Sequence, residues 1–365
     1  MEHEFSEPRY TVGIEEELMI LDETSLDLVN AIHAMLEDPP PGQIHPELLQ
    51  SVLEIATPAS PNVPEAATAL RELRASVRDH AAKHGLLIGS SGTHPFARWE
   101  DQRIVRADRY RELVTSLGFV ARQELVFGLH VHVGVADPDE AIYVANGLRE
   151  YVPLLVALSA NSPFWRGELT GLASTRVPIF RSFPRVGIPP RFEDWADYER
   201  RIEFMVRTGL IADYTYLWYD VRPHPRLGTV EVRAMDGQTR VEHTIAIAAL
   251  IQCLVRDLVE DFLAGRPCVD HTFEILDENK WVAARHGIDA ELVQLPGGER
   301  VPVRQTGARL LERLGGHATE LGCEAELQGI GELLEKGNGA KRQALVYEAN
   351  HDLQELMAEI VAATA

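Results

Sequence analysis

The chain has 365 residues, of which 45% are hydrophobic and 25% charged, and its formal net charge is −21. This composition excludes disordered and fibrous proteins, and the acidic balance argues against nucleic acid as a partner. The longest apolar run, residues 245–255, is too short to span a bilayer, so we expect no membrane partner. The first ten residues lack the apolar core of a secretory signal, and the three cysteines lack metal-binding spacing. We therefore expect a cytoplasmic protein.

Strand and helix patterns are mixed in the first two-thirds of the chain, which favours an α+β fold. Apolar residues at helical spacing predict a helix over residues 64–84, with Gly85 as its C-terminal cap. Period-two alternation predicts strands at 11–21, 51–57, 86–90, 123–135 and 229–235. From residue 241 the pattern is almost all helical, with glycine-rich breaks at 296–298, 315–316 and 337–339. We expect a single domain over 1–365, with the sheet in about 10–240 and a helical layer in about 241–365.

A long aperiodic segment, residues 166–191, contains several prolines and arginines. Loops of this length are usually functional or disordered.

The predicted strand at 123–135 has one unbroken apolar face, formed by its odd positions. The even positions carry Gly128, His130, His132 and Gly134, so the two imidazoles project from the opposite face, about 7 Å apart. The pattern fits a functional pair and two structural histidines about equally.

Carboxylates occupy the polar faces of three other predicted strands. Glu15 and Glu17 share a face of the first, whereas Glu16 falls on its apolar side, which an edge position or a bulge would explain. Glu54 faces away from the core in the second. In the last, Glu231 and Arg233 share the face opposite the core. Each strand taken singly is typical of a half-solvated sheet.

Together these faces suggest a metal site. If the strands form one sheet, their polar faces gather Glu15, Glu17, Glu54, His130, His132 and Glu231. Carboxylates packed together repel one another unless cations neutralise them. Oxygen ligands with one or two nitrogens suit Mg²⁺ or Mn²⁺, and zinc is less favoured because paired His or Cys spacing is absent. Such a surface can hold a nucleoside triphosphate during phosphoryl transfer. P-loop and Rossmann motifs are absent.

At these same strands the sequence resembles the type 2 glutamate–cysteine ligases, a family of carboxylate–amine ligases with a glutamine-synthetase-like fold. The resemblance is carried by TVGIEEEL (11–18), HPELLQSVLEIATP (45–58), GLHVHVG (128–134), LSANSPFWRGELTGLASTR (158–176), TVEVRAMD (229–236) and DENKWVAARHGIDAEL (277–292). It implies a curved, mainly antiparallel sheet whose concave face is catalytic and whose other face is backed by helices.

The resemblance also implies roles for individual residues. The metal ligands would be Glu15, Glu17, Glu47, Glu54, His130 and Glu231. A solvated Glu47 is an equal alternative. His130, His132 and Arg233 would lie on the nucleotide side, and Arg233 with Glu231 would be catalytic. Arg176 would bind a substrate carboxylate, although a loop arginine bound to nothing explains it equally well.

The implied reaction uses ATP with Mg²⁺ or Mn²⁺ to phosphorylate a carboxylate, the γ-carboxylate of glutamate. Cysteine or another amine then attacks the acyl phosphate and forms an amide. The resemblance further implies a homodimer. Two alternatives remain open: a divalent-metal hydrolase that uses the same side chains to activate water, and a non-catalytic nucleotide-binding relative.

Overall fold

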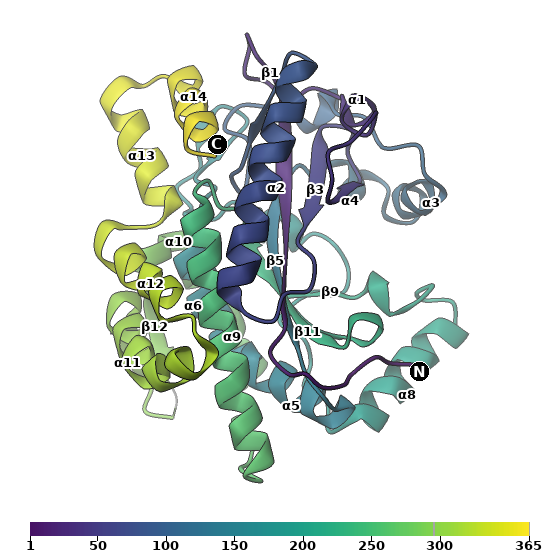
Figure 1. Ribbon diagram of the computed structural model, residues 1–365, viewed down its shortest axis with the longest axis vertical. Coiled ribbons are helices and arrows are strands. Elements are labelled where there is room, and N and C mark those ends of the chain that lie inside the picture. The colour runs from purple at the N-terminus through teal and green to yellow at the C-terminus, as the bar shows by residue number, and fades with distance from the viewer. Residues whose placement is uncertain (295, 365) are drawn as a thin grey trace.

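The computed structural model describes residues 1–294 and 296–364, and its centre is a seven-stranded sheet. The strand order is β10–β11–β5–β1–β3–β2, with β4 also pairing with β1, and all these pairings are antiparallel. The strands are β1 (Val12–Asp22), β2 (Gln43–Pro46), β3 (Val52–Ala56), β4 (Leu86–Gly89), β5 (Gly128–Gly134), β10 (Val221–His224) and β11 (Thr229–Asp236). Helices pack against the sheet (Figure 1), which confirms the predicted α+β class.

The predicted strands are all present, and one of them is shorter than expected. β1, β3, β4 and β11 begin and end within one residue of the predicted bounds. The strand expected over 123–135 spans only Gly128–Gly134, because residues 123–127 form an irregular connection after the short helix α4 (Phe119–Arg122). The amide of Phe127 donates to the carbonyl of Gly92, so the connecting residues bond to a loop.

Two long helices, α2 (Val63–Lys83) and α9 (Val241–Leu263), cover one face of the sheet (Figure 1). The Asn62 side chain caps α2 by accepting from the amide of Glu65, and Gly85 follows its end with φ of 69°. The predicted helix and its glycine cap are thus confirmed. The apolar faces of the strands pack beneath these helices in one core that includes Ile14, Val131, Val232, Leu70 and Ile247.

Glu16 points into this helical side and is fully buried, but neither an edge nor a bulge explains it. β1 is an interior strand between β3 and β5, and its register with both is regular. The Glu16 carboxylate instead accepts from Arg74 of α2, with both N–O distances at 2.7 Å, and from the hydroxyl of Thr244 on α9. Only the packing of α2 supplies this cation, so alternation within β1 could not reveal it.

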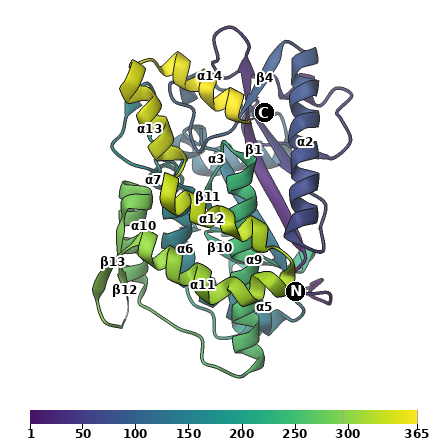
Figure 2. The same ribbon diagram turned by 60° about the vertical axis from the view of Figure 1, so that its left-hand side comes forward.

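The C-terminal third is largely helical: α11 and α12 pack against α9, α10 packs against α6 (Val152–Ser159), and α14 packs against β4 (Figure 2). A hairpin of β12 (Glu291–Gln294) and β13 (Glu299–Pro302) interrupts its helices α10 (Phe273–His286), α11 (Val303–Leu321), α12 (Glu324–Lys336), α13 (Gly339–Asn350) and α14 (Leu353–Thr364). The break predicted at residues 315–316 is wrong, because α11 runs through both glycines. Burial of Leu310, Leu314 and Ala318 along one stripe of α11 outweighs the helix penalty of about 1 kcal/mol per glycine.

The remaining elements are short or lie around the sheet, apart from α5 and α6, which are buried against β10 and β11. They are α1 (Ile32–Met35), α3 (Asp108–Leu117), α5 (Pro138–Leu148), α6 (Val152–Ser159), α7 (Arg176–Phe180), α8 (Trp195–Arg207), β6 (Phe164–Trp165), β7 (Glu168–Leu169), β8 (Val186–Gly187) and β9 (Trp218–Tyr219). One segment, Pro138–Ser159, is long and apolar enough to cross a membrane, but 83% of its most apolar window is buried inside the protein. This degree of burial is typical of a core helix.

Candidate active site

Carboxylates and imidazoles from separate strands meet on the face of the sheet opposite α2 and α9. Glu15 of β1 lies directly opposite His130 of β5. Two residues further along β1, Glu17 lies opposite Glu54 of β3. Because the strands are adjacent and in this register, residues 115 positions apart in sequence become hydrogen-bonded neighbours. The shared polar face predicted from alternation is present.

Five of these side chains form two overlapping groups with ligand atoms close enough to hold a metal ion. One group is Glu15, Glu54 and His130, and the other is Glu17, Glu47 and Glu54; within each, one ligand atom per residue lies within 4.8 Å of the others. Burial and the neighbouring carboxylates Glu47, Glu15 and Glu17 raise the pKa of Glu54. Burial and the charge of Glu17 raise the pKa of Glu47 to about 7. Oxygen donors with a single imidazole nitrogen fit Mg²⁺ or Mn²⁺.

The two histidines of β5 hold Glu15 in its ionised form. His130 Nδ1 lies 3.1 Å from Glu15 Oε2, and His132 Nε2 lies 3.3 Å from Glu15 Oε1. Burial would raise the pKa of Glu15, but the hydrogen bond with His130 and the close approach of the His132 imidazole outweigh it and lower the pKa. His130 Nε2 is buried and has no hydrogen-bond partner among the described residues, which leaves this nitrogen available to a ligand.

Glu231 of β11 lies opposite His132 on the same face, but arginines bind both of its oxygens. Arg222 Nε donates to Oε2 at 2.5 Å, and Arg233 Nη1 donates to Oε1 at 3.3 Å. Burial would raise the pKa of Glu231, but the charges of Arg222 and Arg233 outweigh it and lower the pKa. Glu231 belongs to neither of the two possible metal groups in the described chain, so its role as a metal ligand stays a prediction.

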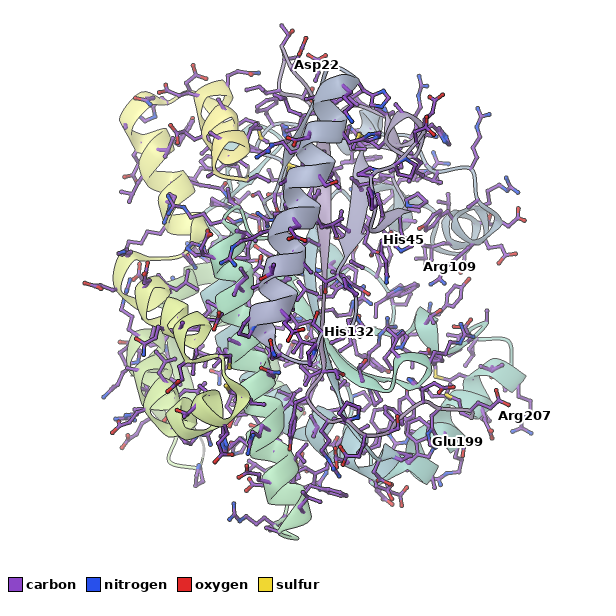
Figure 3. The ribbon with its side chains drawn as sticks, in the orientation of Figure 1. Asp22, His45, Arg109, His132, Glu199 and Arg207 are labelled. Carbon is purple, nitrogen blue, oxygen red and sulfur yellow. The ribbon has the colours of Figure 1, made fainter. Side chains whose placement is uncertain are left out.

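A cavity of about 350 Å³ opens beside the acidic cluster. Its wall includes Glu17, Glu47, Glu54, Arg176 and Arg233, together with His45 of β2, Arg109 and Tyr110 of α3, and Glu124. Figure 3 shows His45 and Arg109 near each other, to the right of α2. α3 contacts the end of β2 there, because the Tyr110 hydroxyl donates to the carbonyl of Pro46 at 2.9 Å. The cavity therefore combines carboxylates with arginines, as a site for an anionic ligand and a divalent cation requires.

Arg176 is buried in this wall as the first residue of α7 and is held in place by the loop that precedes this helix. Its guanidinium donates to the carbonyl of Arg233 at 3.3 Å and stacks over the Phe180 ring at 5.4 Å. Asp236 fixes the loop by accepting from the hydroxyls of Ser162 and Ser174 at 2.6 and 2.8 Å. Arg176 is thus no free loop arginine, while its role towards a substrate carboxylate stays a prediction.

Comparison with known proteins gives the family. A family model described as "Glutamate-cysteine ligase family 2" matches residues 11–359. The chain belongs to glutamate–cysteine ligase family 2. A member from Rubrobacter xylanophilus, named "Putative glutamate--cysteine ligase 2-1", is 44% identical over 97% of this chain and 95% of its own length. The glutamate–cysteine ligase of Natronomonas pharaonis is 39% identical over 93% and 92%.

The family fold is also visible in a solved structure. The crystal structure of a glutamate–cysteine ligase from Francisella tularensis in complex with AMP superposes with a TM-score of 0.71, at 14% sequence identity, over 99% of this chain and 89% of that one. The predicted glutamine-synthetase-like fold and the recognised family are therefore confirmed. These similarities favour a ligase as the function of this protein, over a metal hydrolase or a non-catalytic nucleotide-binding protein.

Several residues of the cavity in this family member escape sequence reasoning. Arg109 and Tyr110 line the cavity from α3, a helix without any strand pattern. Arg222, which binds Glu231 but does not line the cavity, lies on the four-residue strand β10 and was also missed. Glu124 occupies an even position of the predicted strand, like His130, so alternation could have placed it on the same polar face. The backbone is irregular between Glu124 and Gly128, however, so parity does not determine the direction of its side chain.

Proposed function

We propose that this protein is an ATP-dependent carboxylate–amine ligase that joins the γ-carboxylate of glutamate to cysteine or another amine. The γ-phosphoryl group of ATP passes to a carboxylate oxygen and gives ADP and an acyl phosphate. The amine nitrogen then attacks the acyl carbon, loses a proton, and displaces inorganic phosphate to form the amide. The observation that carries this proposal is the convergence of Glu15, Glu17, Glu47, Glu54 and His130 beside a cavity that also contains buried arginines.

Glu15, Glu17, Glu47, Glu54 and His130 would hold Mg²⁺ or Mn²⁺. Bound there, the ions would neutralise the phosphates of ATP and the charge that develops during transfer. Glu231 would keep Arg222 and Arg233 ordered, and Arg233 would face the phosphates as the catalytic arginine. His132, joined to Glu15, would support the nucleotide side of the site together with His130. Catalysis would rest on positioning and charge neutralisation.

Arg176 would bind the carboxylate of the amino-acid substrate through its planar guanidinium. The support for this role is its burial in the cavity wall, beside the acidic cluster. A guanidinium matches a carboxylate with two parallel hydrogen bonds, which a lysine cannot reproduce.

The proposal is tested by an ADP-release screen that crosses a panel of carboxylates with a panel of amines, with Mg²⁺ or Mn²⁺ present. We expect release only when glutamate and an amine such as cysteine are both supplied, and amide formation confirmed by mass spectrometry. Turnover of a carboxylate ester or amide without ATP would instead support a hydrolase. ATP binding without turnover across the panel would support a non-catalytic relative.

We also propose a homodimer in the cytoplasm, from the resemblance of the sequence to its family. Light scattering coupled to size-exclusion chromatography measures the molar mass, and a value near twice 40.7 kDa supports the dimer. A monomer at the enzyme concentration used for the screen would contradict it.

A further inference from the structure

Glu124 places a carboxylate in the cavity wall that no neighbouring residue uses. It lies four residues before β5, and its Oε2 is buried without a hydrogen-bond partner among the described residues. Burial raises the pKa of Glu124 to about 8, and the positive charge that opposes this effect most strongly is that of Arg176. The two side chains nevertheless form no ion pair within 4.0 Å, although both line the same cavity.

Arg176 has a matching surplus of hydrogen-bonding capacity. Its Nε is buried and has no acceptor in the described chain, and its one hydrogen bond from the guanidinium goes to a backbone carbonyl. A buried carboxylate or guanidinium without a partner costs free energy. The surrounding fold holds both groups in this position, because Asp236 fixes the loop of Arg176 and the irregular segment before β5 carries Glu124.

A ligand that carries one positive and one negative group would satisfy both side chains at once. The α-ammonium and α-carboxylate of an amino acid are separated by a single carbon and have these two charges. We propose that Glu124 binds the ammonium group of an amino-acid substrate whose carboxylate is bound by Arg176. This inference rests on the proposed ligase function and adds to it a residue that determines substrate class.

The pair would select amino acids over carboxylates that lack an amine. A site built to hydrogen-bond one polar group rejects an analogue without that group, because the buried site group then stays unpaired. Glutamate and cysteine are both α-amino acids and both carry these two charged groups. The experiment therefore has two arms, one for glutamate as the donor of the acyl group and one for cysteine as the acceptor.

In the donor arm, ADP release is measured with glutamate and with glutarate for the wild type and for Glu124→Gln. If the donor occupies the pair, kcat/KM for glutamate falls by about tenfold or more in the variant, and the value for glutarate stays within about twofold. In the acceptor arm, cysteine is varied at saturating glutamate, and the KM for cysteine rises instead. In both cases the KM for ATP is unchanged.

The matched control is Glu112→Gln, an exposed glutamate on α3, for which all constants stay at wild-type values. The proposal is overturned if Glu124→Gln leaves both amino-acid KM values within twofold, or if it raises the KM for ATP equally. If Glu124→Gln fails to fold, the same measurements are made on Glu124→Asp, which keeps the carboxylate on a side chain that is one methylene shorter.

Calorimetry separates failure of this inference from failure of the ligase function. If no substrate pair releases ADP, titrating glutamate, cysteine and glutarate into both proteins still tests the pair. Loss of amino-acid binding in Glu124→Gln supports the role of Glu124 even without turnover, and unchanged amino-acid binding overturns it.

Discussion

Glu17 and Glu54 face each other directly across the antiparallel pairing of β1 and β3. Like charges in this position destabilise a sheet, and Glu47 adds a third carboxylate to the same group. The sequence nonetheless folds so that all three converge, which supports the proposal that this site binds a divalent cation.

Glu54 is shared by both groups of possible metal ligands, so Glu54→Gln is expected to abolish metal binding. In the wild type, Mn²⁺ at 100 times its dissociation constant would add about 2.7 kcal/mol to the free energy of unfolding. The variant should show no such gain, while its metal-free stability does not fall, because burial and the neighbouring carboxylates already disfavour the charged form of Glu54 and glutamine is neutral. Thermal melts with and without Mn²⁺ measure both effects. A wild-type response to Mn²⁺ in the variant would exclude Glu54 from the site.

The variant Glu231→Gln tests whether Glu231 serves as the counter-charge of Arg222 and Arg233 or as a metal ligand. The substitution leaves Arg222 and Arg233 buried without their counter-charge, so the free energy of unfolding without metal should fall by about 3 kcal/mol. Urea unfolding measures this change, and the double variant Arg222→Met/Glu231→Gln should recover part of it. A stable single variant that has lost only its response to Mn²⁺ would show that Glu231 is a ligand.

Arg176→Lys tests the carboxylate site. Lysine keeps the charge but cannot form two parallel hydrogen bonds, so the KM for the carboxylate substrate should rise by about 10- to 100-fold while the KM for ATP stays unchanged. Arg181→Lys is the matched control, because Arg181 follows in the same segment and is exposed, with its guanidinium bound to Asp277. Equal effects of the two substitutions on the KM would argue against a substrate contact for Arg176.

Protonation of the buried His94 should destabilise the folded state in mild acid. Burial lowers the pKa of His94 from 6.5 to about 4, and its Nδ1 accepts from the amides of Phe96 and Ala97, which requires the neutral ring. The unfolded chain binds the proton first as the pH falls, so the folded state loses up to about 1.4 kcal/mol per pH unit between these two values. Burial raises the pKa of Glu47 to about 7, which stabilises the fold as the pH falls, so the loss due to His94 is measured as the difference between the wild type and His94→Asn in urea unfolding at pH 7 and pH 5. In His94→Asn the stability at pH 7 is lower but the dependence on pH is weaker; parallel curves would contradict this origin.

Much of the site follows from local pattern. Side chains alternate along a strand, so the parity of Glu15, Glu17, Glu54, His130 and Glu231 places each on the polar face as soon as its strand is recognised. The same rule fails for Glu47 and Glu124, which lie outside regular strands. It also fails for Glu16, whose burial is made possible by Arg74 on a helix 58 residues away.

The sequence by itself determined the strands, the helix α2, the family and the carboxylate faces, because these depend on alternation, capping and motif, which are properties of neighbouring residues. Only the tertiary structure decided which faces adjoin. The strand order β11–β5–β1–β3 is set by long-range packing, and it alone brings Glu54 within reach of both acidic groups. The same packing pairs Glu231 with two arginines and places Glu124 and Arg176 in the wall of one cavity, since distances between side chains depend on the whole fold.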